Sequence, residues 1–294
     1  MGDFVIDQDV AQAGSFSSSA VSHAGTANRL NEDGFVNRPD LGLWAVADGA
    51  GGHESGEVAS AEVVASLQGI DPGLPAAEML VEVRARLEQA HAHLREAASQ
   101  RGPDVLMAAT VVVLLVRDDH FACLWAGDSR AYLLRGHTLT RITRDHSLVQ
   151  ALVESGTITE SEADGHPHAN IITRAVGADS DALDLEKRTG QLMAGDRLLL
   201  CTDGLCKTLP EDKLRDLMSA AGDAGAERLV MAALEARVSD NVTAITIDFT
   251  PAARAAAPDS DADGDTDTVS PHIGETAAAS AAPQPAETTP RDSK

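Results

Sequence analysis

Short apolar runs alternate with polar turns along most of the chain, and amphipathic segments interrupt them. Runs rich in Val, Ile, Leu and Phe predict strands, whereas apolar residues at helical spacing predict helices. The predicted strands are 15–22, 43–47, 111–116, 121–126, 131–134, 183–188, 197–201 and 242–249. The predicted helices are 57–67, 76–99, 148–154, 211–220 and 224–237. Because polar turns such as 117–120 join consecutive strands, we expect antiparallel meanders layered with helices, which is an α+β fold.

The composition changes towards both ends of the chain. Residues 1–14 are polar and mixed, and we expect them to fray. Residues 15–250 carry the apolar pattern of one large domain, interrupted at 155–170 by a polar segment without a core pattern. Residues 251–294 are rich in Ala, Pro, Asp and Thr and nearly lack large apolar side chains. Such a tail cannot bury enough surface to offset its ordering entropy, so we expect it to be disordered.

The tail contains a run of alternating aspartates, from Asp259 to Asp267, with the spacing of half a calcium loop. Ser270 stands where such a loop has its bidentate Glu, and no predicted helices flank the run. We interpret the run as an acidic linker, with weak calcium binding as the alternative.

Charge and cysteine content narrow the class of protein. The formal net charge is -23 and the isoelectric point is about 4.6, which argues against a nucleic-acid partner because phosphate backbones attract Lys and Arg. The three cysteines, Cys123, Cys201 and Cys206, lie in apolar or motif segments and are expected to be reduced core thiols. Neither a signal peptide nor a membrane-spanning run is visible, so we expect a soluble, cytoplasmic protein without membrane insertion.

A single carboxylate, Asp48, follows the apolar run 43–47 and precedes a glycine cluster. Glycines let the backbone turn and bring its carbonyl and amide groups close to a ligand. An Asp-Gly pair is also an ordinary turn, so this stretch alone fits either a turn or a metal or phosphate site. Acidic residues at the ends of other predicted strands are Glu32, Asp33, Asp128, Asp203 and Asp240. Such carboxylates can converge on one edge of a sandwich.

These acids belong to an ordered series of motifs: N-E-D, A-D-G-x-G-G-H-x-x-G-E-x-A-S, M-x-x-T, A-G-D-S-R-A-Y, T-x-D-H-S-L-V, C-T-D-G-L and S-D-N-V-T. The series resembles the bacterial branch of the type 2C, metal-dependent serine/threonine protein phosphatases (the PPM family), over residues 15–248. The resemblance implies a four-layer α-β-β-α sandwich of two mainly antiparallel sheets flanked by helices. It also implies that 155–170 is a mobile flap beside the active site that helps to choose substrates.

The resemblance further implies two or three Mn²⁺ or Mg²⁺ ions, with a hydroxide that bridges two of them and attacks phosphorus directly. Asp48 would bridge both ions, and Asp203 and Asp240 would complete one site. Glu32 and the Gly49 carbonyl would belong to the other site, while Asp33 would orient a metal-bound water. Asp128 with Asp203 would hold a third, weaker ion, as in some relatives.

Two positions depart from the family pattern. Relatives usually carry a phosphate-binding Arg where this chain has Asn28, and Arg29 follows one place later. Arg29 is therefore either the shifted substrate-binding residue or a surface residue beside a turn. Ala50 stands where some relatives carry a His as candidate general acid and others a Met. The leaving alkoxide needs a proton, so His53 is a candidate catalytic proton donor. Alternatively, a metal-bound water donates this proton. His53 would then only stabilise the glycine turn.

The leading hypothesis is a phosphatase of phosphoserine and phosphothreonine on proteins that opposes a bacterial Ser/Thr kinase and acts as a monomer. A second hypothesis is a non-catalytic pseudophosphatase that serves as a binding module, which Ala50 and the shifted Arg29 favour. A third is a phosphatase dedicated to one regulatory phosphoprotein. All the expected metal-ligand positions hold the expected acids, which favours the first hypothesis over the second.

Overall fold

The computed structural model describes residues 4–7, 16–27, 30–51, 55–163, 165–220 and 224–250. Arg29, His53 and the predicted tail 251–294 with its aspartate run lie outside the described residues. The strands are β1 (Val5–Asp7), β2 (Phe16–His23), β3 (Asp33–Arg38), β4 (Leu43–Ala50), β5 (Ala108–Ala109), β6 (Val111–Arg117), β7 (His120–Ala126), β8 (Arg130–Arg135), β9 (Thr138–Arg141), β10 (Glu186–Gln191), β11 (Arg197–Cys201) and β12 (Val242–Phe249). The helices are η1 (Pro39–Leu41), α1 (Ser55–Gln68), α2 (Ala76–Arg101), α3 (Leu148–Glu154), α4 (Glu160–Ala163), α5 (Asp203–Cys206), α6 (Glu211–Ser219) and α7 (Gly225–Glu235).

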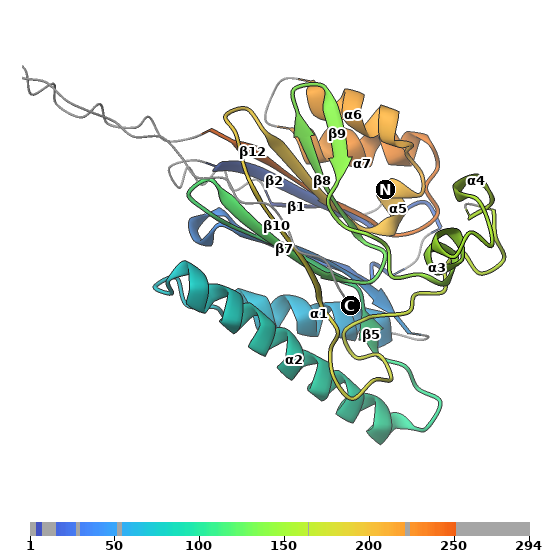
Figure 1. The fold of residues 1–294 in the computed structure, drawn as a ribbon. Helices are drawn as coiled ribbons and strands as arrows, with labels where there is room; N and C mark the ends of the chain where they lie inside the picture. The colour runs from blue at the N-terminus through green and yellow to red at the C-terminus, as the bar shows by residue number, and fades with distance from the viewer. Residues whose placement is uncertain are drawn as a thin grey trace, which may run out of the picture. The chain divides into compact units, whose positions relative to one another are not determined.

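Two sheets lie at the centre of the domain (Figure 1). One has the strand order β1-β2-β12-β11-β8-β9, and the other has the order β10-β7-β6-β4-β3, with the short β5 paired to β4. Every strand pair recorded among the described residues is antiparallel. The expected antiparallel pairing is therefore confirmed, but the meander is not continuous, because the consecutive strands β7 and β8 lie in different sheets.

Strand β4 shows how the hydrophobic pattern builds the core. Trp44 and Val46 pack between the two sheets, whereas Leu43, Ala45 and Ala47 pack on the side of the helices. Successive side chains of a strand point to opposite faces, so an unbroken apolar run is the pattern of a strand that is buried on both faces. β6 alternates between the same two clusters.

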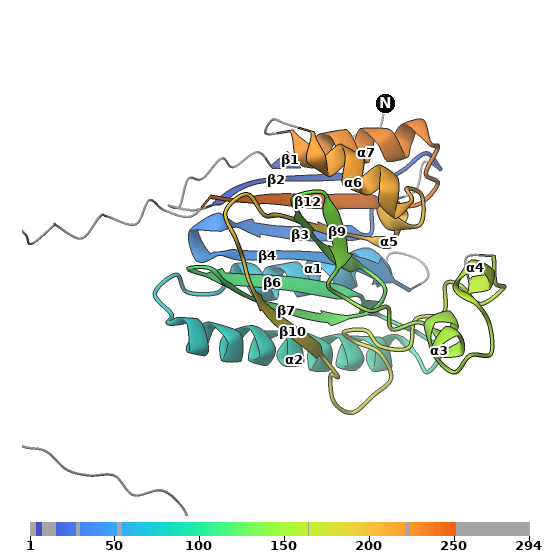
Figure 2. The same ribbon diagram turned by 45° about the horizontal axis from the view of Figure 1, so that its top comes forward.

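Helices cover the outer face of each sheet. α1 packs against β3, β4 and α2, and α7 packs against β2, β12 and α6. Figure 2 shows the two sheets between these helix pairs. The predicted four-layer α-β-β-α sandwich is therefore confirmed. No helix in the described part of the chain is long and apolar enough to cross a membrane.

Both edges of the sandwich differ in detail from the sequence-based expectation. Val5–Asp7, which we expected to fray, forms β1 and pairs with β2. The strand predicted at 183–188 is β10, which starts later, at Glu186, and pairs with β7 through Gln191. Leu183 and Leu185 pack against the core before the strand begins. β10 is a polar edge strand, and backbone pairing rather than apolar periodicity sets its limits.

His91 on α2 differs from a further expectation: His91 and His93 are two positions apart and cannot share a helix face, so the sequence predicts surface positions for both. The His91 side chain is buried: Nδ1 accepts a hydrogen bond from the Gly177 amide at 2.9 Å, and Nε2 lies 3.0 Å from the Ser180 carbonyl. Since Nδ1 accepts, Nε2 carries the proton and donates. His93 is exposed, as expected, beside Glu62. The imidazole of His91 therefore ties the loop before β10 to α2.

The cysteines match the expectation of reduced core thiols. Cys123 and Cys201 are buried, Cys206 is half-buried, and all three are free. Burial raises the pKa of the Cys123 thiol. The Cys123 thiol is therefore a poor candidate for a reactive nucleophile.

Candidate metal centre

The predicted acids meet where strands from the two sheets end side by side. Asp33 at the start of β3 faces Asp48 near the end of β4 in the antiparallel register. In the other sheet, Asp203 follows β11 and Asp240 precedes β12, and the two strands are antiparallel neighbours. An antiparallel pair brings the end of one strand next to the start of the other. Four carboxylates from distant parts of the sequence therefore share one edge of the sandwich.

Asp33 is held by two threonines of the opposite sheet. Its Oδ2 accepts hydrogen bonds from Thr202 Oγ1 at 2.8 Å and from Thr243 Oγ1 at 2.7 Å. Its Oδ1 is buried and has no hydrogen-bond partner among the described residues. Burial is the main cause that raises the pKa of Asp33, from 3.8 to about 7, and the charges of Asp203 and Asp240 raise it further against the two hydrogen bonds. Among the described residues, no hydrogen-bond donor therefore compensates the Oδ1 side of this carboxyl group.

The backbone of Asp48 is fixed by Thr110. The Asp48 amide donates to Thr110 Oγ1 at 3.1 Å, and the Thr110 amide donates to the Asp48 carbonyl at 2.8 Å. Burial raises the pKa of Asp48 well above its ordinary value, and the nearby carboxylates of Asp33, Asp203 and Asp128 add to the effect. Like charges held this close destabilise one another unless a cation or a proton lies between them.

The Glu32 carboxyl group and the Gly49 carbonyl oxygen lie close to the same point at the start of α1. A metal ion bound by both groups would require them to lie close together. A Cβ on Gly56 would lie 2.8 Å from the Glu32 carboxyl group and 2.8 Å from the Gly49 oxygen. A Cβ on Gly49 would lie 2.0 Å from the Gly56 carbonyl oxygen. The two glycines therefore let the start of α1 approach both oxygen donors, which side chains at these positions would prevent.

Asn241 positions Glu32, a role that the sequence analysis did not assign. Its Oδ1 accepts a hydrogen bond from the Glu32 amide at 2.8 Å, and its Nδ2 donates to the carbonyls of Ala24 and Leu30, each at 3.1 Å. These hydrogen bonds thus hold the backbone before β3 against the start of β12. The S-D-N-V-T motif marked Asn241 as part of the site region without showing what it contacts.

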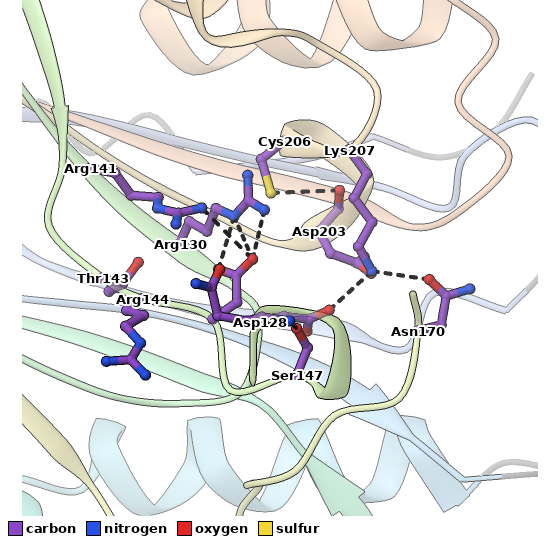
Figure 3. Close-up of polar contacts among 12 residues, drawn as sticks. Asp128, Arg130, Arg141, Thr143, Arg144, Ser147, Asn170, Asp203, Cys206 and Lys207 are labelled. Carbon is purple, nitrogen blue, oxygen red and sulfur yellow. Dashed lines mark hydrogen bonds and ion pairs between the residues drawn. The ribbon is translucent and has the colours of Figure 1, made fainter. Parts of the chain in front are cut away.

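Lys207 is a second residue that the sequence analysis missed. Its Nζ donates to Asp203 Oδ2 at 2.7 Å, to Asp128 Oδ2 at 3.0 Å and to Asn170 Oδ1 at 3.1 Å (Figure 3). Burial lowers the pKa of Lys207, but Asp203 and Asp128 together raise it above its ordinary value. Burial and Asp203 raise the pKa of Asp128, and Lys207 opposes this shift. The predicted ligands Asp128 and Asp203 therefore share an ammonium group.

A cleft of about 760 Å³ opens beside this lysine. Its lining includes Arg130, Asp145 and residues of α3, α4 and the segment up to Asn170. Arg130 forms a bidentate pair with Asp145, with Nη2 2.6 Å from Oδ2 and Nε 3.0 Å from Oδ1. The predicted flap 155–170 thus forms one wall of the cleft, and it contains the short helix α4.

His146 anchors the turn that carries Asp128. Its Nδ1 accepts from the Gly127 amide at 3.3 Å, and its Nε2 lies 3.0 Å from Glu186 Oε2. Its ring stacks on Trp125, with the ring centroids 6.0 Å apart. Burial lowers the pKa of His146, while Glu186 opposes this shift. The T-x-D-H-S motif therefore has a structural role in this chain.

The structure brings together the predicted ligand positions Glu32, Asp48, Gly49, Asp128, Asp203 and Asp240, and it places Asp33, which was predicted to orient a metal-bound water, beside them. The described residues contain no group of three or more His, Cys, Asp or Glu side chains already arranged to hold a metal ion. The chemistry of the site nevertheless fits a hard divalent cation, since every predicted ligand is an oxygen atom and Asp33 has an unpartnered buried oxygen.

Comparison with known proteins identifies the class to which this fold and site belong. A family model described as Protein phosphatase 2C matches residues 22–239. The chain is 35% identical over 232 residues to the serine/threonine protein phosphatase PstP of Mycobacterium tuberculosis, a match that covers 78% of this chain and 44% of that protein. It is 32% identical over 237 residues to the protein phosphatase PhpP of Streptococcus pneumoniae, covering 76% of this chain and 94% of that one. The chain thus spans less than half the length of the mycobacterial relative.

Solved structures agree with this assignment. PppA of Pseudomonas aeruginosa superposes with a TM-score of 0.74 at 38% identity, covering 80% of this chain and 97% of that one. The catalytic domain of PstP, solved in complex with two manganese ions, gives a TM-score of 0.71 at 33% identity and covers 80% of this chain and 99% of that one. The chain belongs to the protein phosphatase 2C family.

Proposed function

We propose that this protein removes phosphate from phosphoserine and phosphothreonine on proteins, with the help of two Mn²⁺ or Mg²⁺ ions. Asp48 would bridge the ions, Asp203 and Asp240 would complete one site, and Glu32 with the Gly49 carbonyl would complete the other. The observation that carries this proposal is the convergence of these acids at one edge, with the pKa values of Asp33 and Asp48 raised. Carboxylates that repel one another in this way are drawn together by a divalent cation.

Bound divalent ions would supply a nucleophilic hydroxide at neutral pH and positive charge against the phosphoryl oxygens. The residues of the chain hold and orient these groups. Asp33 keeps Oδ1 available to accept a hydrogen bond from water, because Thr202 and Thr243 occupy only Oδ2. The cleft beside the flap gives the polypeptide around the phosphorylated residue a place to lie.

Turnover of a phosphothreonine peptide and of p-nitrophenyl phosphate in Mn²⁺, in Mg²⁺ and in EDTA tests the proposal. We expect metal-dependent turnover that EDTA abolishes and that Asp48→Asn reduces at least about a hundredfold, since the bridging ligand is lost. Asp181→Asn is the matched control, because Asp181 is an exposed carboxylate outside the site. Turnover that is indifferent to EDTA would contradict the metal mechanism.

Absence of turnover in folded, metal-loaded protein would favour the second candidate, a non-catalytic binding module. The specific observation behind that candidate is Ala50, which provides no side chain to protonate a leaving group. His53 as proton donor and Arg29 as phosphate-binding residue remain part of the catalytic proposal. Separate His53→Ala and Arg29→Ala variants in the same assay test them: loss of turnover is expected for each.

We also propose that the substrates are proteins phosphorylated by a Ser/Thr kinase, that the protein acts in the cytoplasm and that it is a monomer. The names of the relatives support phosphoprotein substrates. Sedimentation of the purified protein tests the oligomeric state. Dephosphorylation of a proteome labelled by a co-expressed Ser/Thr kinase tests the substrate class, and breadth of turnover there distinguishes a general phosphatase from one dedicated to a single phosphoprotein.

A further inference from the structure

We propose that the ammonium group of Lys207 takes the place of a third metal ion between Asp128 and Asp203, so that the centre of this protein binds two divalent ions and not three. The inference rests on the proposed function, because it concerns the same group of acids. Lys207 would then supply, as a permanent part of the protein, the positive charge that an exchangeable metal ion would otherwise supply.

The local fold places Lys207 over Asp203. α5 begins at Asp203, and the Lys207 amide closes this turn by donating to the Asp203 carbonyl at 2.8 Å. Residues four apart lie on the same face of a helical turn, so the ammonium group folds back onto the Asp203 carboxylate. Asp128 reaches the same ammonium group from the turn after β7.

The ammonium group has a full set of acceptors. A lysine has three N–H donors, and Lys207 has three oxygen partners: Asp128, Asp203 and Asn170. The Asp128 and Asp203 side chains are only 6% and 15% exposed, whereas the Lys207 side chain is 35% exposed, so the two contacts are shielded from water on the carboxylate side. Shielded contacts of opposite charge are stronger than contacts on an open surface.

A metal ion that used both carboxylates would have to displace this cation. Asp128 Oδ2 and Asp203 Oδ2 are the oxygens that Lys207 occupies, and two positive charges in one place repel each other. Asp203 retains its other oxygen for the proposed two-ion centre. Lys207 therefore competes with the third ion without removing a ligand from the first two.

Asn170 connects this cation to the flap. It is the last residue of the predicted flap 155–170, and its only contact in this network is the side-chain oxygen that accepts from Lys207 at 3.1 Å. A third ion that displaced Lys207 would also have to replace the hydrogen bond between Lys207 and Asn170. The hydrogen bond from the Lys207 ammonium group thus holds the end of the flap at the cleft (Figure 3).

Calorimetric titration of the metal-free protein with Mn²⁺ tests the inference, with the number of bound ions as the readout. We expect two ions in the wild type and in Asp128→Asn, with dissociation constants that agree within about threefold, a difference under 1 kcal/mol. In Lys207→Met we expect a third, weaker ion, which the double variant Lys207→Met, Asp128→Asn loses. Lys207→Arg keeps the charge and should keep two ions.

Lys213→Met is the matched control, because it removes an exposed positive charge on α6 and leaves the acids alone. It should bind two ions. Three ions in the wild type, one of them lost in Asp128→Asn, would overturn the inference and leave the proposed function standing. Two ions in Lys207→Met would also overturn it. Absence of Mn²⁺ binding to the wild type would overturn the proposed function, and the inference with it.

The titration of wild type and Asp128→Asn decides the question even if Lys207→Met does not fold. Thermal unfolding in EDTA checks folding of each variant before titration. Asn170→Ala adds a separate readout of the flap: limited proteolysis of 155–170 should accelerate in both Asn170→Ala and Lys207→Met and stay unchanged in Lys213→Met. An unchanged cleavage rate in the first two variants would contradict the link between Lys207 and the flap.

Discussion

Asp33 and Asp48 face each other across the β3–β4 pair, so the register of one hairpin places two half-buried carboxylates side by side. Like charges directly opposite each other in a sheet are destabilising. The fold keeps them because Thr243 in β12, Thr202 after β11 and Thr110 before β6 fix their positions. Stability is therefore reduced at the edge where a cation is expected to bind, which leads to the first prediction.

Asp33→Asn should stabilise the metal-free protein at pH 8 by about 1–3 kcal/mol and have little effect at pH 5. The pKa of Asp33 is about 7 in the folded protein against an ordinary 3.8, so the folded state binds more protons than the unfolded state between these values. Wild-type stability should accordingly rise as the pH falls through 7. Urea unfolding in EDTA at both pH values measures the difference between the two proteins. A variant less stable than wild type at pH 8 would show that the Asp33 charge is compensated within the fold.

Gly56→Ala should weaken Mn²⁺ binding at least about tenfold, because the new Cβ would press on the Glu32 carboxyl group and the Gly49 oxygen at 2.8 Å. Alanine in a helix is ordinarily favourable by about 0.5–1 kcal/mol relative to glycine, so a loss here has to come from the site. Calorimetry measures the affinity. Gly165→Ala is the control, since a Cβ there meets nothing within 4 Å and should leave binding unchanged.

Asn241→Ala should destabilise the protein by about 1–3 kcal/mol and weaken Mn²⁺ binding about 10–100-fold. The Glu32 amide and the carbonyls of Ala24 and Leu30 would lose their partner together. Thermal unfolding measures the change in stability, and metal titration measures the change in Mn²⁺ affinity. Asn170→Ala provides the comparison on the exposed flap, where we expect a change in stability within about 0.5 kcal/mol. Equal effects of the two variants on stability would argue against the positioning role of Asn241.

His91→Ala should cost about 2–4 kcal/mol of unfolding free energy, because it leaves the Gly177 amide without its acceptor and creates a cavity under α2. His93→Ala, two residues further along the same helix, should change stability by less than about 0.5 kcal/mol. Urea unfolding of both variants in EDTA measures the contrast. Catalytic activity, corrected for the folded fraction, should be the same in both, since neither side chain reaches the metal centre.

The limits of the helices and of the central strands could be predicted from the sequence because they depend on local periodicity. α3 spans the predicted 148–154, and β6 extends the predicted 111–116 by one residue. The limits of the polar edge strand β10 were misjudged and strand β1 was missed, since backbone hydrogen bonds to a neighbouring strand, and not side-chain pattern, stabilise them. His91 was misplaced because its partners, Gly177 and Ser180, lie more than 80 residues away in the sequence.

By itself, the sequence determined the strand periodicity, the buried faces and the acids that stand at strand ends, because each of these is a property of neighbouring residues. Only the tertiary structure decided that Asn241 holds Glu32 and that the ammonium group of Lys207 lies between Asp128 and Asp203. The Asn241 contact spans 209 residues and the Lys207–Asp128 contact 79. Contacts of this kind arise when two sheets pack face to face and their strand ends meet, an arrangement that no local sequence pattern encodes.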